Sequence, residues 1–563
     1  MLAPGCGFRC ITGVHPLAPV VSGRPASLRR PEAHVLAVAW LAALALAGIG
    51  GDFPLNDDWS YARTVQRLAE TGVYAPGGWT SMPLLANVAW GALFCLPAGF
   101  SHEALRLSTV VAGAAMGYGS YVLARDLGWR RGPAAVAMAT VLFNPLTVVS
   151  SASFMTDVPS AAAVVWAAVF FARAIRQPEG AAWLWATVFS VVATLSRQTG
   201  LALPLAFGLV LVVRHGVRPG IVGRAAAPLA ACVVALVAYG RWLEASGRVP
   251  ALYAVKTEML AQRLADPGGL AAVVALNGYG AGLTLGLLLA PVAALAVAGL
   301  AGRRPRLMWG VAAGAVAIGG LAAAVKALPV LGNGLVPSGA GPLTLYDRLI
   351  LHLGTVPALP PAFWASATLV GGASAVVLLA AAVAGAARAV RRADAEAAPA
   401  LAVGAFLLLS GAATLAPLFP GDFFDRYLIP VVPLWGIGAL AAPRTVSRGA
   451  LTTAAVLLVG MAAFSTVALH DYFAWNRARW ALLAHVETEA PEVWREIDGG
   501  FEFNGWTRYD PRTAKSSDRS WWAPSVRDIV TFGPVPGYRE VASVPYVRWW
   551  PAGEARVRWL RAE

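Results

Sequence analysis

Three carboxylates stand at the ends of long apolar runs in this sequence. Asp57 and Asp58 lie in "PLNDDWSYA", and Asp157 lies in "SFMTDVPSAAA". An ionisable side chain is costly to hold at the edge of a hydrocarbon layer, which makes it a candidate functional group. Carboxylates that converge can supply a general base or oxygen ligands for a divalent cation. We therefore predict that Asp57, Asp58 and Asp157 are catalytic, and we leave open a divalent metal ion held by Asp57 and Asp157.

Helix capping is the alternative explanation of the same acids. Asn56 or Asp57 would cap an amphipathic helix that follows, with Asp58 in its first turn, where the helix dipole favours an anion. Thr156 or Asp157 would cap the next apolar run in the same way. A cap needs only one acid, however, so capping leaves the second member of the Asp57–Asp58 pair unexplained.

Cationic side chains interrupt the apolar runs at three further places. Arg197 and Gln198 lie in "TLSRQTGLALP", Arg426 and Tyr427 in "FFDRYLIPVVP", and Arg106, a weaker candidate, in "EALRLST". A guanidinium matches the oxygens of a phosphate, and we predict that these residues bind a lipid-linked phosphate near the bilayer surface. The alternatives are an arginine that extends its charged end to the interface and an ordinary interfacial tyrosine.

The chain that must position these residues is strongly apolar. Of its 563 residues, 58% are hydrophobic and 13% are charged, whereas soluble proteins average about 25% charged residues. Apolar runs of about 20 residues recur, each long enough to cross a bilayer. We predict an all-α polytopic membrane protein. The net charge of +14 comes from arginines in short connections, a pattern that sets membrane topology, so we predict no nucleic-acid partner.

Arginine placement predicts about thirteen transmembrane helices, with the N-terminus cytoplasmic and the C-terminus extracytoplasmic. The "SMPLLANVAWGALFCLPAGF" segment is assigned to an interfacial helix. The predicted spans lie near 34–51, 103–123, 134–150, 158–174, 182–196, 199–213, 226–242, 270–300, 308–325, 363–387, 399–416, 428–442 and 450–468.

The composition divides the chain into three parts. Residues 1–33 are rich in Pro, Gly and Arg and are predicted to form a disordered cytoplasmic tail. Residues 34–468 hold the spans, with the candidate catalytic loops on the outer face. Residues 469–563 are polar and rich in Trp, and we predict a small extracytoplasmic α/β domain. In it, "IDGGFEFNGW", "YREVASVPYVRWW" and "ARVRWLRA" are expected to be strands.

Five motifs resemble, in order, those of polyprenyl-phosphate-dependent glycosyltransferases with the GT-C fold. This group includes the protein O-mannosyltransferase, aminoarabinose transferase and Rgt-type families. The motifs, spread over residues 35–440, are "NDDWSYA", "GFSHEALRLST", "MTDVPSAA", "LSRQTGLALP" and "DRYLIPVVP". The resemblance implies a multi-pass enzyme of a bacterial-type plasma membrane, surrounded by membrane lipids. It would transfer a sugar from a polyprenyl-phosphate donor to an acceptor lipid, glycan or protein at the outer face.

The resemblance also implies roles for individual residues. Asp57 corresponds to the first-loop aspartate of the family, a base or metal-linked carboxylate, and Asp58 to the acid beside it, which is Glu in many relatives. Asp157 corresponds to the second-loop acid. Arg197 and Arg426 correspond to positions that handle the lipid-linked phosphate, although "RQTG" stands where many relatives have a lysine–glycine pair.

Two functions of other classes remain as alternatives. A transporter or flippase of lipid-linked sugars predicts polar residues at mid-bilayer and inverted repeats, and Asn277 and Tyr279 are the best candidates for such residues. A non-catalytic envelope assembly protein would use the C-terminal domain as its binding module and would tolerate changes at both outer aspartates.

Overall fold

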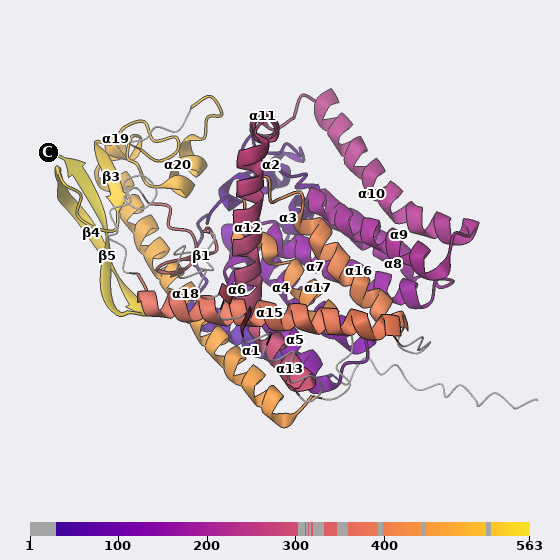
Figure 1. Cartoon of the computed structure of the whole chain (residues 1–563). Coiled ribbons are helices and arrows are strands. Elements are labelled where there is room, and N and C mark those ends of the chain that lie inside the picture. The colour runs from indigo at the N-terminus through magenta and orange to yellow at the C-terminus, as the bar shows by residue number, and fades with distance from the viewer. Residues whose placement is uncertain are drawn as a thin grey trace, which may run out of the picture.

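The computed structural model describes residues 30–301, 310, 313–314, 317–318, 332–345, 358–391, 398–440, 446–513 and 519–563 (Figure 1). Most of the predicted tail, most of the predicted span 308–325 and part of the stretch between the predicted spans 308–325 and 363–387 lie outside these residues. The first helix begins at Pro31. The division of the chain at 33 and 468 therefore stays a prediction.

The described part of the chain is mostly helical. Its helices, of which η2 and η4 are short 3-10 helices, are α1 (Pro31–Ala47), α2 (Asp58–Thr71), α3 (Leu85–Cys95), α4 (His102–Asp126), α5 (Arg131–Phe143), α6 (Pro145–Ser151), α7 (Asp157–Arg176), α8 (Ala182–Ser196), η2 (Gln198–Leu201), α9 (Ala202–His215), α10 (Pro219–Ala245), α11 (Ala251–Leu264), α12 (Pro267–Leu288), α13 (Ala290–Ala301), α15 (Pro361–Arg391), α16 (Ala398–Leu415), η4 (Asp425–Leu428), α17 (Val431–Gly438), α18 (Arg448–Glu489), α19 (Pro491–Trp494) and α20 (Phe501–Arg508). The strands are β1 (Leu335–Val336), β2 (Gly339–Ala340), β3 (Asp528–Thr531), β4 (Tyr538–Trp549) and β5 (Ala552–Ala562).

Eight of the described helices are long and apolar enough to cross a membrane: α4, α7, α9 with η2, α10, α12, α15, α16 and α18. The number rises to nine if α5 and α6, bent by 55°, form one broken span. The protein is therefore a multi-pass membrane protein, as predicted, but the count of about thirteen spans is not confirmed. Within the described residues of the predicted span 428–442, for example, the only α-helix is α17 with eight residues, well short of the roughly 20 that a bilayer needs.

Local sequence explains where several helices begin and end. Asn144 precedes Pro145, and the residue before a proline avoids the helical region. Asn144 accordingly has extended backbone angles, and its side-chain oxygen accepts the N–H of Thr147 at 2.9 Å. This interruption separates α5 from α6. The stretch between the predicted spans 226–242 and 270–300 contains a further helix, α11.

The helices α4 and α7 lie at the centre of the helical part. In their apolar windows, 72% and 78% of residues are buried by the rest of the protein, against 22% in α10. Small residues allow other helices to approach closely, as is common in membranes. A Cβ on Gly286 of α12 would lie 2.0 Å from the carbonyl oxygen of Gly371 in α15. Because most of the apolar window of α10 is not buried by the protein, its outer face is available to contact lipid.

The C-terminal region is joined to the helical part by α18, which runs for 42 residues without a break across the predicted boundary at 468. It leads toward a three-stranded antiparallel sheet of order β3-β5-β4, at the left in Figure 1. The ring of His470 stacks on Trp549 at 3.8 Å, and Asp471 Oδ1 accepts the N–H of Trp549 at 2.7 Å. These contacts hold the tip of the β4–β5 hairpin against the helix.

The structure confirms the predicted small α/β part and two of its three predicted strands, which are β4 and β5. The prediction for "IDGGFEFNGW" was wrong, because Phe501–Arg508 form the helix α20. The buried Asp498 carboxylate accepts the N–H groups of Gly500 at 3.1 Å and Ser520 at 2.9 Å. Gly500 has a φ of +89°, so the chain turns there instead of continuing as a strand.

A buried ion pair connects α18 to α20. Arg479 Nη1 donates to Glu502 Oε2 at 2.8 Å, and both side chains have 0% exposure. Thr344, from the segment after β2, donates its hydroxyl to the same carboxylate oxygen at 2.6 Å. Removal of one partner of such a pair destabilises the protein strongly, because the remaining charge stays buried without a counter-charge.

We predict that Glu502→Gln lowers the free energy of unfolding by roughly 3–5 kcal/mol, because Arg479 loses its counter-charge. Thermal unfolding of the purified protein in detergent, followed by tryptophan fluorescence, measures the effect. Glu492→Gln, at an exposed position of α19, is the matched control and should unfold like the unchanged protein. Equal unfolding temperatures for both variants would contradict the assigned role of the pair.

Candidate active site

Four charged side chains from four separate segments meet near the N-terminal end of α2. Asp57 Oδ2 accepts Arg426 Nη2 at 3.1 Å. Arg426 Nε lies 3.6 Å from Asp157 Oδ2, and Asp157 Oδ1 accepts Arg197 Nη1 at 2.8 Å. The side chain of Asp157 is 2% exposed and that of Arg426 is 6% exposed, whereas Asp57 and Arg197 reach 19% and 13%. Asp57 is therefore the more accessible of the two paired carboxylates.

The three aspartates predicted from the sequence have two different roles in the structure. Asp58 is buried and faces away from this pair of arginines. Its Oδ1 accepts the N–H of Leu55 at 2.6 Å, and its Oδ2 accepts the N–H of Phe154 at 3.0 Å. Because Phe154 lies three residues before Asp157, Asp58 ties the segment of Asp57 to the segment of Asp157. Asp58 therefore positions the site and lies outside the charged cluster.

Asp425 holds Arg426 in a similar way. This buried carboxylate accepts the N–H of Gly334 at 2.8 Å and the N–H of Leu335 at 2.5 Å. Burial raises the pKa of Asp425 to about 7, although the N–H groups of Leu335 and Gly334 lower it. In Asp57–Asp58 and in Asp425–Arg426, one aspartate is anchored by backbone N–H groups, and the charged residue beside it faces the cluster.

The electrostatics of the cluster depend on burial and on opposite charges. Burial lowers the pKa of Arg426, but Asp157 and Asp57 more than offset this, so the pKa lies above the ordinary value for arginine. Burial raises the pKa of Asp58 to about 8, against the opposing effect of its two backbone donors. Arg426 therefore keeps its charge, and Asp58 is neither exposed nor poised to accept a proton from a substrate.

The capping interpretation of the acids is not supported by their contacts. Neither Asp57 nor Thr156, the residues that precede α2 and α7, makes a side-chain cap hydrogen bond. Asp57 Oδ1 instead accepts the indole N–H of Trp79 at 3.0 Å, and the Asp157 carboxylate turns to Arg197 and Arg426. A nearby guanidinium attracts the carboxylate more strongly than neutral backbone N–H groups do.

The other predicted phosphate-binding residues differ in their placement. The guanidinium carbon of Arg197 lies over the ring of Tyr427, 4.8 Å from the ring centroid. Gln198 is exposed, and its amide donates to the carbonyl of Ser81 at 3.4 Å. Tyr427 therefore borders the charged cluster, whereas the contacts of Gln198 place it at the rim.

Arg106 is not brought into the cluster. Its guanidinium is buried, and it donates to the backbone carbonyls of Ile49 and Gly51 at 2.8 and 2.9 Å and of Ala152 at 2.8 Å. These bonds connect the segment after α1 to the segment after α6. Arg106 therefore supports the loops that carry the acids, and its donors are already used.

Several residues of the site had no signal in the sequence. Asn333 Oδ1 accepts from Arg426 Nη1 and from the amide of Asn56, the latter at 2.9 Å. The N–H of Asn56 donates to Glu502 Oε1 at 2.9 Å. Both asparagines have positive φ, 57° and 82°, a conformation that asparagine tolerates better than most residues. The adjacent glycines of Asn333 indicate a turn, but not a contact with residues so distant in sequence.

A divalent metal ion, left open from the sequence, finds little support in this arrangement. Among the described residues, no group of three or more His, Cys, Asp or Glu side chains is placed to hold a metal. Arg426 lies between the carboxylates of Asp57 and Asp157, in the place where a cation would have to bind both. We therefore derive no step through a metal.

The comparisons with known proteins cover different parts of the chain. Residues 82–242 match the family model described as "Dolichyl-phosphate-mannose-protein mannosyltransferase". The match confirms the family resemblance of the motifs in this part of the chain, which includes Asp157 and Arg197 but neither Asp57 nor Arg426. No curated protein sequence matches the chain.

Solved structures with some similarity include ArnT from Cupriavidus metallidurans bound to undecaprenyl phosphate. It has a TM-score of 0.38 and 13% identity, over 94% of this chain and 97% of that chain. The apo form of that protein has a TM-score of 0.34 and 15% identity, over 84% and 83%. The arabinosyltransferase EmbB from Mycobacterium smegmatis has a TM-score of 0.31 and 15% identity, over 84% of this chain and 43% of that chain. These TM-scores are too low to support a conclusion about fold or function.

We predict that Asp58→Asn destabilises the protein, because an amide nitrogen cannot accept one of the two backbone N–H groups. A buried donor left unsatisfied costs about 1–3 kcal/mol. Asp57→Asn, one residue away at a partly exposed position, keeps an oxygen for Trp79 and leaves Asp157 as the counter-charge of Arg426, so it should lose less stability. Thermal unfolding of the two variants tests this difference, and a larger loss for Asp57→Asn would overturn the assignment.

Proposed function

We propose that this protein is an integral membrane glycosyltransferase that transfers a sugar from a polyprenyl-phosphate donor to an acceptor at the outer face of the membrane. The observation that carries the proposal is the guanidinium of Arg426, held between Asp57 and the buried Asp157. It places an accessible carboxylate beside fixed positive charge, which is what the transfer requires. The matched family, named for a dolichyl-phosphate-mannose-dependent activity, supports the same class of reaction.

Asp57 acts as the general base in the proposed reaction. The acceptor hydroxyl oxygen attacks the anomeric carbon of the donor sugar, and its proton passes to the Asp57 carboxylate. The bond from the anomeric carbon to the phosphate oxygen breaks, and the polyprenyl phosphate leaves with the electron pair. Attack opposite the leaving group inverts the anomeric centre. A base positioned in this way contributes about 10²–10⁴-fold to a rate.

The arginines offset the charge that develops on the leaving phosphate. Preorganised donors in a partly buried site are effective for this purpose, because they need little reorganisation during the reaction. Arg426 Nε is buried 3.6 Å from Asp157 Oδ2, so Arg426 contributes a fixed positive charge to the site. Arg197 is more accessible and presents a second guanidinium. In this proposal the phosphate lies beside Arg197 and Arg426, and the acceptor hydroxyl lies at Asp57.

The membrane helices supply the place for the lipid. The polyprenyl tail would lie in the bilayer among the apolar outer faces of the spans, with the phosphate at the level of Arg197 and Arg426. We place the N-terminus in the cytoplasm and the C-terminal part outside, on the basis of arginine bias in the connections. The acceptor is a lipid, a glycan or a protein that approaches from the outer side.

We predict that Asp57→Asn reduces sugar transfer by about 10²-fold or more, because the base is removed. The rate is measured with purified protein, an extract of lipid-linked sugars and cell-envelope acceptors, at equal amounts of folded protein. Asp126→Asn, which removes a carboxylate paired with Arg173 at 2.7 Å in another part of the chain, is the control and should retain activity. Full transfer by a well-folded Asp57→Asn protein would overturn the proposal.

The donor is identified by deleting the gene and profiling surface glycans together with polyprenyl-phosphate sugars. A transferase predicts the loss of one sugar from the surface and the build-up of its lipid carrier in the outer leaflet. Build-up of that carrier in the inner leaflet would instead show a flippase, and an unchanged profile of both would contradict either activity.

A further inference from the structure

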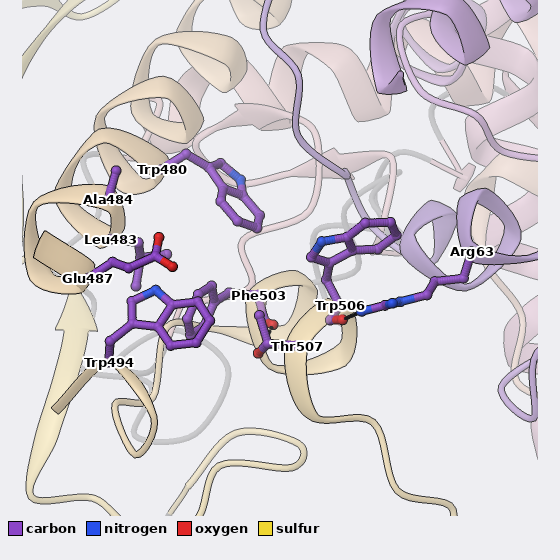
Figure 2. A pocket seen from close by; sticks show the side chains of 9 residues that line it. All are labelled: Arg63, Trp480, Leu483, Ala484, Glu487, Trp494, Phe503, Trp506 and Thr507. Carbon is purple, nitrogen blue, oxygen red and sulfur yellow. Dashed lines mark hydrogen bonds between the residues drawn. The ribbon is translucent and has the colours of Figure 1, made fainter. Parts of the chain in front are cut away.

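A second site lies beside the candidate active site, between α2, α18, α19 and α20. It is a partly open cavity of about 440 Å³, within the roughly 300–1,000 Å³ of typical small-molecule sites. Figure 2 shows Trp480 and Trp494 on one side, the carboxylate of Glu487 between them, and Trp506 across the space. The side chains that define this Trp pocket are Arg63, Trp480, Glu487, Trp494, Phe503 and Trp506.

The rings of the Trp pocket are held in place by other rings. Trp494 meets the buried Phe503 at 5.5 Å and 86°, and Trp480 meets the same ring at 5.9 Å and 63°. His102 contacts Trp506 edge-on at 4.8 Å. Each tryptophan remains partly exposed. The rings therefore form preorganised flat surfaces that need little ordering when a ligand binds.

Two polar groups of the Trp pocket have no partner in the part of the chain that the structure describes. Glu487 is exposed, and the described residues give its carboxylate no hydrogen bond or ion pair. The indole N–H of Trp480 is buried, and it has no hydrogen-bond partner among the described residues. One strong acceptor and one donor thus lie beside apolar ring faces. A pyranose has the complementary surface, since its C–H groups pack on rings while its hydroxyls both donate and accept.

The charges of the Trp pocket favour a neutral ligand over an ion. Arg63 places its guanidinium 4.2 Å from the centroid of Trp506 and donates to the carbonyl of Trp506. This internal cation already occupies a ring face that would bind an external cation. Glu487 in turn disfavours an anion such as a phosphate. One positive and one negative side chain leave the Trp pocket without net charge.

The Trp pocket is connected to the candidate active site through two elements. Arg63 lies six residues after Asp57, roughly 9 Å farther along α2 at 1.5 Å per residue. Phe503 directly follows Glu502, which accepts the N–H of Asn56 beside the catalytic acid. Both elements that border the Trp pocket therefore also reach the loop that carries Asp57.

We propose that the Trp pocket binds a neutral sugar unit of the acceptor, at a distance from the hydroxyl that receives the transferred sugar. Binding of a neutral sugar follows from the Trp pocket itself, whereas its assignment to the acceptor rests on the proposed function. Acceptors that carry a further neutral sugar would then bind more tightly than acceptors that lack it, and the acceptor class would be a glycan or a glycan-bearing lipid or protein.

The test uses the full chain in lipid nanodiscs without donor. Tryptophan fluorescence and calorimetry measure the binding of glucose, mannose, galactose, N-acetylglucosamine and their β-1,4-linked disaccharides, with choline and inorganic phosphate as charged probes. We expect at least one neutral sugar to bind. Trp494→Ala should weaken its affinity at least tenfold, and Glu487→Gln, at an exposed position, should weaken it several-fold with no effect on folding.

Two variants separate the outcomes. Trp185→Ala removes an exposed tryptophan of α8 and should leave sugar binding unchanged, and Asp57→Asn should bind the sugar normally while it fails in transfer. In transfer assays, Trp494→Ala should raise the KM for the acceptor and leave the KM for the donor unchanged.

Absence of binding by every neutral sugar, equal affinity for Trp494→Ala, or preferential binding of choline or phosphate would overturn the Trp pocket as a sugar site. Sugar binding that is intact in a protein without transfer activity would instead overturn the proposed function alone. Intact transfer by a protein that binds none of the sugars would overturn only the Trp pocket.

Discussion

A guanidinium buried between two carboxylates is the interaction on which this site depends. Removing a charge from water is costly unless an opposite charge and hydrogen bonds replace the lost hydration. Arg426 receives this compensation from Asp57, Asp157 and Asn333, which come from three different segments. Its place is therefore set only when all three segments have folded around it. The same requirement leaves Asp57 beside a fixed positive charge, in a geometry suited to a general base.

The neighbouring acids show how the chain maintains that geometry. Asp58 and Asp425 are both buried, and each accepts two backbone N–H groups. Asp425 accepts both from another segment, whereas Asp58 accepts one from its own segment and one from Phe154. Each anchored acid is followed or preceded directly by a residue of the charged cluster. Two adjacent charged residues can thus have different roles, because consecutive side chains point in different directions. One is anchored by backbone N–H groups, and the other faces the cluster.

The C-terminal part contacts the loop of the candidate active site directly. Glu502 joins the buried Arg479 of α18 to the backbone of Asn56, beside the first acid. The continuous helix α18 carries this part from the membrane-spanning helices to the C-terminal sheet. The loop of Asn56 and Asp57 is therefore supported on one side by α20, and the same helix supplies rings to the Trp pocket. The candidate active site and the Trp pocket consequently share their support.

The sequence by itself determined the multi-pass helical class, the small C-terminal α/β part, the helix after Asp58 and the residues from which the cluster is built. These follow from local properties, namely long apolar runs, charges at their ends and alternation in strands. Only the tertiary structure decided that Asp57 faces the cluster while Asp58 is anchored away from it, that Arg106 binds backbone carbonyls, and that Asn333 contacts Arg426. The short α17 likewise changed the expected spans. Each of these outcomes depends on a burial or pairing partner far away in the chain, and the energy of a buried charge is undefined until that partner is in place.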